Sequence, residues 1–392
     1  QNVAVGFAAG LAVTTGTKNT IVGGEAGKAI TTGANNVAVG QAALDANTTA
    51  SNNTAVGVDA LGANTTGTEN VAVGKGAADS NTTGRNNVAM GMETLQANTT
   101  GDNNTALGSG ALYNNTTADE NTAVGFNTLV SNTTGTQNVA MGNNALGQVT
   151  NGNYNVAIGR EAGKTMTTSN YNVCIGRTAG MLITTGGSNT IVGGNAGDAV
   201  TTGGGNIFMG NEAGGDVTTG SSNVCIGSGA DTSQVNSDRQ IVMGNSVTGA
   251  GNDHLTFGHG SADSAINFGA TSITAPSDQR YKEDIATATA GLSFIKDLRP
   301  ITFKWKKEKD LPASHRAYVE GSESRTINDY TNHGFVAQEV KTAIDAHSEI
   351  KDGFDMWSTD DQADGGRQRI GDASLMPMMV KAVQELSTAL DA

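Results

Sequence analysis

The sequence predicts a mainly β fold: a parallel β-roll, or solenoid, of 17-residue repeats, followed by a small α+β domain with a C-terminal coiled-coil helix. Two observations predict the solenoid. Asn recurs every 17 residues from Asn2 to Asn223 without an insertion, and Gly recurs with the same period from Gly6 to Gly244. Short, strict repeats rich in β-forming residues are typical of stacked coils. A third observation separates the second domain, because all four prolines and both tryptophans lie at or beyond Pro276.

Composition and charge limit the classes of function. The chain has 392 residues, too many for one ordinary domain. Its net charge of −14 disfavours a nucleic-acid partner. No run of 18 apolar residues is present, so we expect no membrane insertion. Because the chain begins with Gln1 and not with Met, we expect a piece of a longer protein or a processed product.

Each repeat contains one short strand. In the copy at residues 36–52, with Asn36 as position one, Val37 and Val39 point to one face of the strand and Ala38 points to the other. A strand that is apolar on both faces must be covered on both faces. One face can fill the inside of its own coil. The other needs a partner, which is most simply another copy of the chain.

Positions nine and twelve of the repeat vary together. Copies with Leu at position nine have Asn at position twelve, and copies with Gly at nine have Val, Ile or Met at twelve. Each coil therefore receives one large apolar side chain from one position or the other, as expected of a close-packed interior. The copy with Leu146 and Val149 breaks the rule. The Leu residues are Leu44, Leu61, Leu95, Leu112 and Leu129, and the Gly residues are Gly10, Gly27, Gly163, Gly180, Gly197 and Gly214.

The recurring polar residues allow more than one role. Asn at position one can form a side-chain ladder between stacked coils, or it can be a turn residue. An ice-binding face would need Thr at i and i+2 on one flat surface. Adjacent Thr residues point to opposite faces of a strand, so the Thr-Thr pairs can present only one outward row, which disfavours this alternative.

Cys174 and Cys225 occupy the same repeat position three copies apart. At about 4.8 Å per coil their sulfur atoms would be roughly 14 Å apart, beyond disulfide reach. We expect small buried residues in place of Ala, with no metal-binding or redox role. The sequence indicates no cofactor and no metal site.

The period ends near residue 245, and we expect residues 246–276 to form a cap or neck that follows the shaft at 1–245. The domain at 277–392 then shows mixed patterns. A helical face of Leu292, Ile295 and Leu298 is followed by an alternating strand at 301–305. A second helix begins within 334–340, and residues 352–368 are predicted to form a loop.

The last segment predicts a short coiled coil. Five apolar residues step by three and four along it, as the core positions of a heptad repeat do. Two heptads alone would be marginal, so the pattern implies helices held together by the rest of the domain. The five residues are Met376, Met379, Val383, Leu386 and Leu390.

Four blocks at 277–392 resemble, in the same order, the self-cleaving intramolecular chaperone domain at the C-terminus of many phage tail fibres, tailspikes and endosialidases. The blocks are Ser277-Asp278-x-Arg280-x-Lys282-x-x-Ile285; Leu298-Arg299-Pro300 leading into Phe303 and Trp305; residues 334–339, with Gly334, Phe335, Gln338 and Glu339; and residues 380–386. The resemblance implies a homotrimer that guides fibre folding and then cuts itself between Pro276 and Ser277. It makes Ser277 the nucleophile and Lys282 the base.

The implied chemistry is consistent with these residue types. A serine hydroxyl needs a nearby base, and Lys can act as one where burial lowers its pKa. Attack by Ser277 on the Pro276 carbonyl would give an ester that water opens. Asp278 and Arg280 are expected to order the loop.

The repeats over 1–245 more weakly resemble the head repeats of YadA-like trimeric adhesins. We therefore predict a phage tail fibre or receptor-binding shaft of the virion, with a host cell-surface receptor as partner, for which a glycan is one candidate. One alternative is a bacterial cell-surface adhesin, which should continue into a membrane anchor. The other is a carbohydrate-degrading tailspike, which should show paired carboxylates in a cleft.

Overall fold

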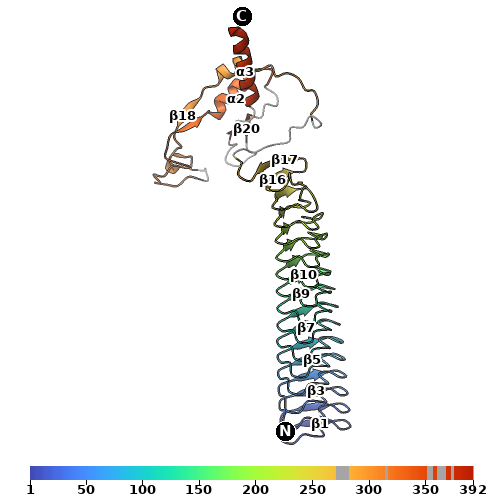
Figure 1. The fold of residues 1–392 in the computed structure, drawn as a ribbon. Helices are drawn as coiled ribbons and strands as arrows, with labels where there is room; N and C mark the ends of the chain where they lie inside the picture. Colours follow the sequence, from blue (N-terminus) through green and yellow to red (C-terminus); the bar gives the residue numbers. More distant parts are fainter. Residues whose placement is uncertain (271–281, 314–316, 351–355, 360–367, 372–374, 392) are drawn as a thin grey trace. The chain divides into compact units, whose positions relative to one another are not determined.

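The computed structural model describes residues 1–270, 282–313, 317–350, 356–359, 368–371 and 375–391 (Figure 1). The chain divides into two compact units, Gln1–Ser277 and Asp278–Ala392.

The first unit is a parallel β-solenoid in which every repeat adds one coil (Figure 1). Each of the first fourteen strands pairs in parallel with the strand of the next repeat, so that Val37 lies beside Thr54 and Val39 beside Val56. This pairing confirms that one 17-residue copy forms one coil. The strands are β1 Val3–Val5, β2 Thr20–Val22, β3 Val37–Val39, β4 Thr54–Val56, β5 Val71–Val73, β6 Val88–Met90, β7 Thr105–Leu107, β8 Thr122–Val124, β9 Val139–Met141, β10 Val156–Ile158, β11 Val173–Ile175, β12 Thr190–Val192, β13 Ile207–Met209, β14 Val224–Ile226 and β15 Ile241–Asn245.

Position three of each repeat supplies the inside of the coil. Ala38 is fully buried, whereas Val37 and Val39 are only half-buried and point outward. The same position holds the buried side chains of Cys174, Phe208 and Cys225. The strands therefore supply mostly small side chains to the core of the solenoid, and they keep an outward apolar face.

Positions nine and twelve share one space, as the sequence predicts. A Cβ atom on Gly27 would lie 2.8 Å from Cδ1 of Ile30, and one on Gly163 would lie 2.9 Å from Cε of Met166. A large residue at position nine is therefore incompatible with these side chains at position twelve. Where Leu44 fills the space instead, Asn47 stands at position twelve, and both are fully buried.

The recurring Asn forms a buried ladder, which decides between the two roles that the sequence left open. The Asn36 backbone N–H donates to Oδ1 of Asn19 at 2.9 Å, and Asn36 Nδ2 donates to the carbonyl of Ala50 at 2.9 Å. The pattern repeats in successive coils. Each Asn thus ties its own coil to its neighbour and also donates to a backbone carbonyl 14 residues further along the chain.

The solenoid ends in a hairpin. Strand β16, His254–His259, pairs in parallel with β15, but only 14 residues separate Ile241 from its partner Leu255. Strand β17, Ala262–Asn267, then pairs antiparallel with β16. This change of direction follows the loss of the 17-residue period, and it covers the edge that the last coil would expose.

The second unit is a small α+β domain. Its core contains Phe294, Leu298, Val340, Ile344 and Met356. The expected loop at 352–368 includes part of a short hairpin, because β20 pairs antiparallel with β21. The elements are α1 Leu292–Asp297, β18 Ile301–Phe303, the 3-10 helix Glu308–Asp310, β19 Asn332–Gly334, α2 Ala337–Ala346, β20 Trp357–Thr359, β21 Gln368–Ile370 and α3 Leu375–Leu390.

Candidate functional site

Most of the first motif block lies outside the described residues. Pro276, Ser277, Asp278 and Arg280 fall in the segment 271–281, about which the structure gives no geometry. Lys282 is the first described residue after that segment, and its side chain is exposed in the single chain. The assignment of nucleophile and base therefore stays a prediction.

The second and third motif blocks contact each other. Arg299, which precedes Pro300, forms a two-pronged ion pair with Glu339 in the first turn of α2, with Nε to Oε2 at 2.9 Å and Nη2 to Oε1 at 2.5 Å. Hydrogen bonds from Arg299 hold the pKa of Glu339 below its usual range. The contact joins two blocks that are 40 residues apart in sequence.

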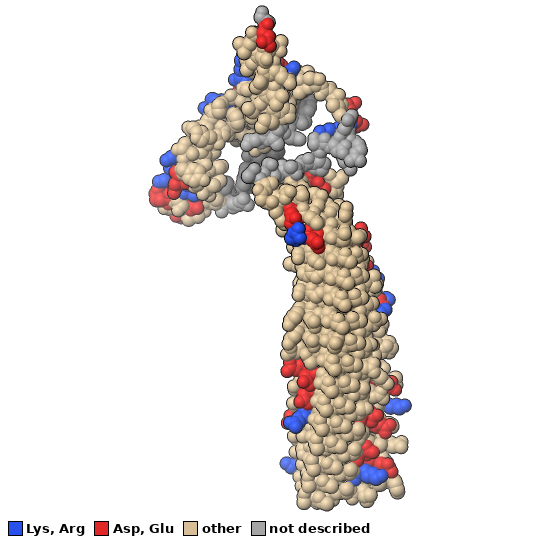
Figure 2. All heavy atoms as spheres, viewed as in Figure 1, with Lys and Arg blue, Asp and Glu red and all other residues tan. Residues whose placement is uncertain are grey.

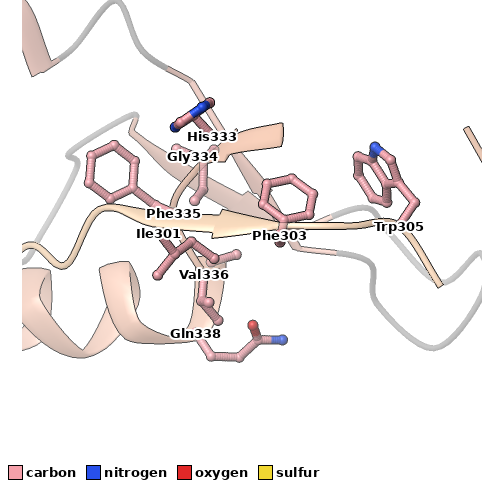
Figure 3. A pocket seen from close by; sticks show the side chains of 10 residues that line it. Ile301, Phe303, Trp305, His333, Gly334, Phe335, Val336 and Gln338 are labelled. Atoms are coloured by element: carbon pink, nitrogen blue, oxygen red, sulfur yellow. The ribbon is translucent and has the colours of Figure 1, made fainter. Parts of the chain in front are cut away.

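These two blocks also line an open pocket of about 590 Å³ (Figure 3). Phe303 and Trp305 meet edge to face, with their ring centroids 5.2 Å apart. Phe335 contributes from the chain leading into α2, and Gln338 from the first turn of that helix. Gly334 lies directly opposite Ile301 in the β18–β19 pair. Because most of the lining is apolar, the pocket suits an apolar side chain better than acid–base chemistry. Its full lining is Ile301, Phe303, Trp305, His333, Gly334, Phe335, Val336, Ala337, Gln338 and Ile370.

The fourth block holds helix α1 in place. The N-cap residue of α1 is Gly291, which offers no side-chain cap. Instead, Oε2 of Glu385 on α3 accepts a hydrogen bond from the backbone N–H of Leu292 at 2.8 Å. A carboxylate at a helix N-terminus satisfies an unpaired N–H and is favoured by the helix dipole. Sequence reasoning matched Glu385 to the block without finding this role.

Helix α3 has two apolar faces. One packs against the domain core through Leu375 and Met378, and Ala382 on the same helix is buried. The other carries the five predicted coiled-coil residues, all exposed in the single chain by between 46% and 86%. In one copy this apolar seam is exposed to solvent. Its members are Met376, Met379, Val383, Leu386 and Leu390.

Sequence reasoning missed His347, which follows α2. Its Nε2 lies 2.9 Å from Oδ2 of Asp297, and its Nδ1 lies 3.2 Å from Oε1 of Glu349. The ring also meets Phe294 edge to face at 5.5 Å. The hydrogen bond to Asp297, supported by Glu349, raises the pKa of His347 above its ordinary value. His347 therefore links α1 to α2 most strongly when it is protonated.

The outward apolar face of the solenoid is continuous. Positions two and four of every repeat hold Val, Thr, Ile, Leu or Met, and we call this row the strand face. Among its most exposed members are Met90, Met141, Met209 and Met243, at 41% to 44%. Figure 2 shows one side of this unit, on which uncharged residues make up most of the surface. A long apolar row on a solvent-exposed surface is a feature of interaction surfaces.

The cysteines are structural. Cys174 and Cys225 are both free and buried, and burial raises the pKa of each thiol to about 12. They are thus neutral at physiological pH and take the place of Ala, as the sequence predicts. Within the described ranges, no group of three or more His, Cys, Asp or Glu side chains could hold a metal ion. In those same ranges, no helix combines the length and the apolar character needed to cross a membrane.

The geometry defines a class of protein: a repetitive parallel β-solenoid followed by a small α+β domain with an unpartnered apolar helix face. Residues 277–348 match a family model, Peptidase_S74, described as "Chaperone of endosialidase". The chain thus carries a chaperone of endosialidase domain C-terminal to a β-solenoid. The match begins at Ser277 and includes the first three motif blocks. A search of curated proteins and a search of solved structures each found no match.

Proposed function

We propose that this chain is a phage tail fibre or receptor-binding shaft of the virion. In this proposal its C-terminal domain directs trimerisation and in-register folding and then cuts itself off between Pro276 and Ser277. One observation carries the proposal: the family match starts at Ser277, the residue directly after the proposed scissile bond, and it follows the solenoid. Membership of this peptidase family implies a self-cleaving serine peptidase domain.

The cleavage step uses two side chains. Lys282 removes the proton of the Ser277 hydroxyl, and Oγ attacks the carbonyl carbon of Pro276. The Pro276–Ser277 peptide bond breaks, its nitrogen takes up a proton to become the amino group of Ser277, and an ester joins the two residues. Water then hydrolyses the ester, which leaves a carboxylate on Pro276 and restores the hydroxyl of Ser277. Because Lys282 is exposed in one chain, the burial that would make it a base must come from the assembled trimer.

The homotrimer is supported by two apolar surfaces. In the single chain the strand face of the solenoid is half-exposed, and the seam on α3 is exposed. Covering them with further copies of the same chain removes apolar area from water, which favours association. Trimers would form the shaft, and a host cell-surface receptor would be its partner.

A repetitive shaft creates a need for a chaperone. Three chains displaced by one or two copies would lose only the contacts at the ends, so misaligned trimers should be kinetic traps. The C-terminal domain has no internal repeat and can align three chains in one way. A chain of residues 1–276 expressed alone should therefore give aggregates or ragged rods. Uniform trimers that melt like the released shaft would refute the chaperone role.

The cleavage itself is tested by denaturing mass spectrometry of the purified chain. The unmodified chain should give two fragments divided between Pro276 and Ser277. Ser277→Ala and Lys282→Ala should each stay intact. Ser293→Ala and Lys296→Ala are matched controls because both side chains are exposed on α1, and these variants should be cut normally. Efficient cutting of Ser277→Ala or Lys282→Ala would refute the assignment.

A further inference from the structure

Two exposed tyrosines stack on the surface of the solenoid. Tyr154 and Tyr171 occupy position 17 in adjacent coils, and their rings lie 4.9 Å apart with only 2° between the ring planes. Their exposed fractions are 48% and 61%. Both residues have left-handed backbone conformations, with φ of 59° and 60°. That conformation is disfavoured for bulky residues, so packing within the coil does not explain why tyrosines stand here.

Position 17 faces solvent along the shaft and does not belong to the strand face. In other coils it holds residues that are unsuited to an apolar contact between copies. The two tyrosines interrupt a polar column. The other residues of this column are Lys18, Asn35, Asn52, Glu69, Asn86, Asn103, Glu120, Gln137, Ser188, Gly205, Ser222 and Arg239.

A ladder beside the tyrosines ends at the same place. At position 16, the backbone N–H of Thr136 donates to Oδ1 of Asn153 at 2.7 Å, and the N–H of Asn153 donates to Oδ1 of Asn170 at 2.7 Å. The next two coils have Gly187 and Gly204 at this position, which offer no side-chain acceptor. The N–H groups of Asn170 and Gly187 consequently have no hydrogen-bond partner among the described residues.

Gly187 and Gly204 place no side chain beside Tyr171, and we call this stretch of surface the recess. A Cβ atom on Gly187 would lie 3.1 Å from the carbonyl oxygen of Asn170 and 3.9 Å from its backbone N, and one on Gly204 would lie 3.0 Å from the carbonyl oxygen of Gly187 and 3.7 Å from its backbone N. The next residue in the tyrosine column is the small Ser188. The recess therefore combines one ring face that Tyr154 does not cover with two unpaired amide donors.

We propose that this recess binds a pyranose ring of a neutral glycan. The apolar C–H face of the sugar would stack on the outer face of Tyr171, whose π-system attracts the slightly positive hydrogens. Oxygen atoms of the sugar would accept hydrogen bonds from the N–H groups of Asn170 and Gly187. A neutral sugar is proposed because the groups that would contact it, the ring of Tyr171 and two backbone N–H groups, carry no charge. The site does not depend on self-cleavage.

Saturation-transfer NMR on the full chain, with methyl β-D-galactopyranoside and methyl β-D-glucopyranoside as probes, tests the site. At least one probe should show transfer to the protons of its apolar face. Tyr171→Ala should weaken binding by about tenfold or more, which corresponds to about 1.4 kcal/mol. Tyr113→Ala, which removes a partly exposed tyrosine elsewhere on the shaft, should bind as the unmodified chain does.

Gly187→Asn separates binding from folding. The new side chain would continue the position 16 ladder by accepting from Asn170 N–H, and it would fill the recess. This variant should melt no lower than the unmodified chain and should lose sugar binding. Absence of transfer to both probes in the unmodified chain, or unchanged binding by Gly187→Asn, would overturn the site. A change in oligomeric mass on Tyr171→Ala would also overturn it, because the tyrosines would then form a contact between copies.

Discussion

Asn132 Nδ2 donates a hydrogen bond to Oδ1 of Asn115 at 2.9 Å, but Oδ1 of Asn132 is buried without a partner. This pair ends a second ladder, formed by Asn at position twelve from Asn47 onward. The following coil has Val149 at that position, so no amide reaches Asn132. A column of amides that all donate in one direction always leaves one acceptor unpaired at its end.

The ladder predicts different costs for the same substitution at two sites. Asn132→Val moves the end of the ladder by one coil and leaves the number of unpaired acceptors unchanged. Asn98→Val divides the ladder and newly leaves Oδ1 of Asn81 without its donor. Asn98 and Asn132 each donate to the carbonyl three residues further along the chain, and both coils have Leu at position nine. The two substitutions therefore lose the same local hydrogen bond in similar surroundings. Guanidinium unfolding should show that Asn98→Val costs about 1–3 kcal/mol more. Equal costs would contradict the ladder argument.

The recurring glycine at position five predicts a sharp intolerance to Ala. Gly40 has φ of 138°, and a Cβ atom there would lie 2.3 Å from the carbonyl oxygen of Gly57 in the next coil. Since both atoms belong to the backbone, no side chain can move aside. Gly40→Ala should lower the unfolding free energy by at least about 2 kcal/mol. Gly24 stands at position six of the preceding repeat, and a Cβ atom there would have nothing within 4 Å. Gly24→Ala should therefore change the unfolding free energy by less than about 0.5 kcal/mol.

His347 predicts a pH dependence of the C-terminal unit. Its pKa is raised above the ordinary value of 6.5 in the folded state, chiefly by Asp297. A raised folded-state pKa contributes stability that is fully present below pH 6.5 and is lost as the pH rises through the folded-state value. Both tryptophans lie in this unit, so their fluorescence can follow its melting. The melting temperature should fall above pH 6.5 in the unmodified chain and less in His347→Gln. An equal fall in both would exclude this role for His347.

The seam on α3 predicts a surface for assembly. Leu386 is 46% exposed on that seam, and Leu386→Asp would place a charge in a packed interface between copies, which is unfavourable without a partner. Light scattering should show a loss of trimer for this variant. Thr388→Asp is the matched control, because Thr388 lies on the same helix outside the heptad core positions. Trimer formation by Leu386→Asp would mean that the seam does not hold the copies together.

The sequence alone determined the architecture of the shaft. A strict 17-residue period predicts one coil per copy, and the pairing of Val37 with Thr54 confirms it. Positions nine and twelve hold Leu44 and Asn47 in one repeat but Gly27 and Ile30 in another, which predicts that the two positions share one interior space. The distances around Gly27 confirm this prediction. These features could be predicted because each coil contacts only its neighbours, so residues one period apart in sequence lie next to each other in the structure.

The tertiary structure decided what the period could not. Only the stacking distance between coils shows that Asn36 bonds to Asn19 and is more than a turn residue. In the C-terminal unit, Arg299 with Glu339 and Glu385 with Leu292 are 40 and 93 residues apart in sequence. No local pattern of spacing encodes such pairs. They form because the packing of α1, α2 and α3 around a common core fixes which distant side chains come within hydrogen-bonding distance.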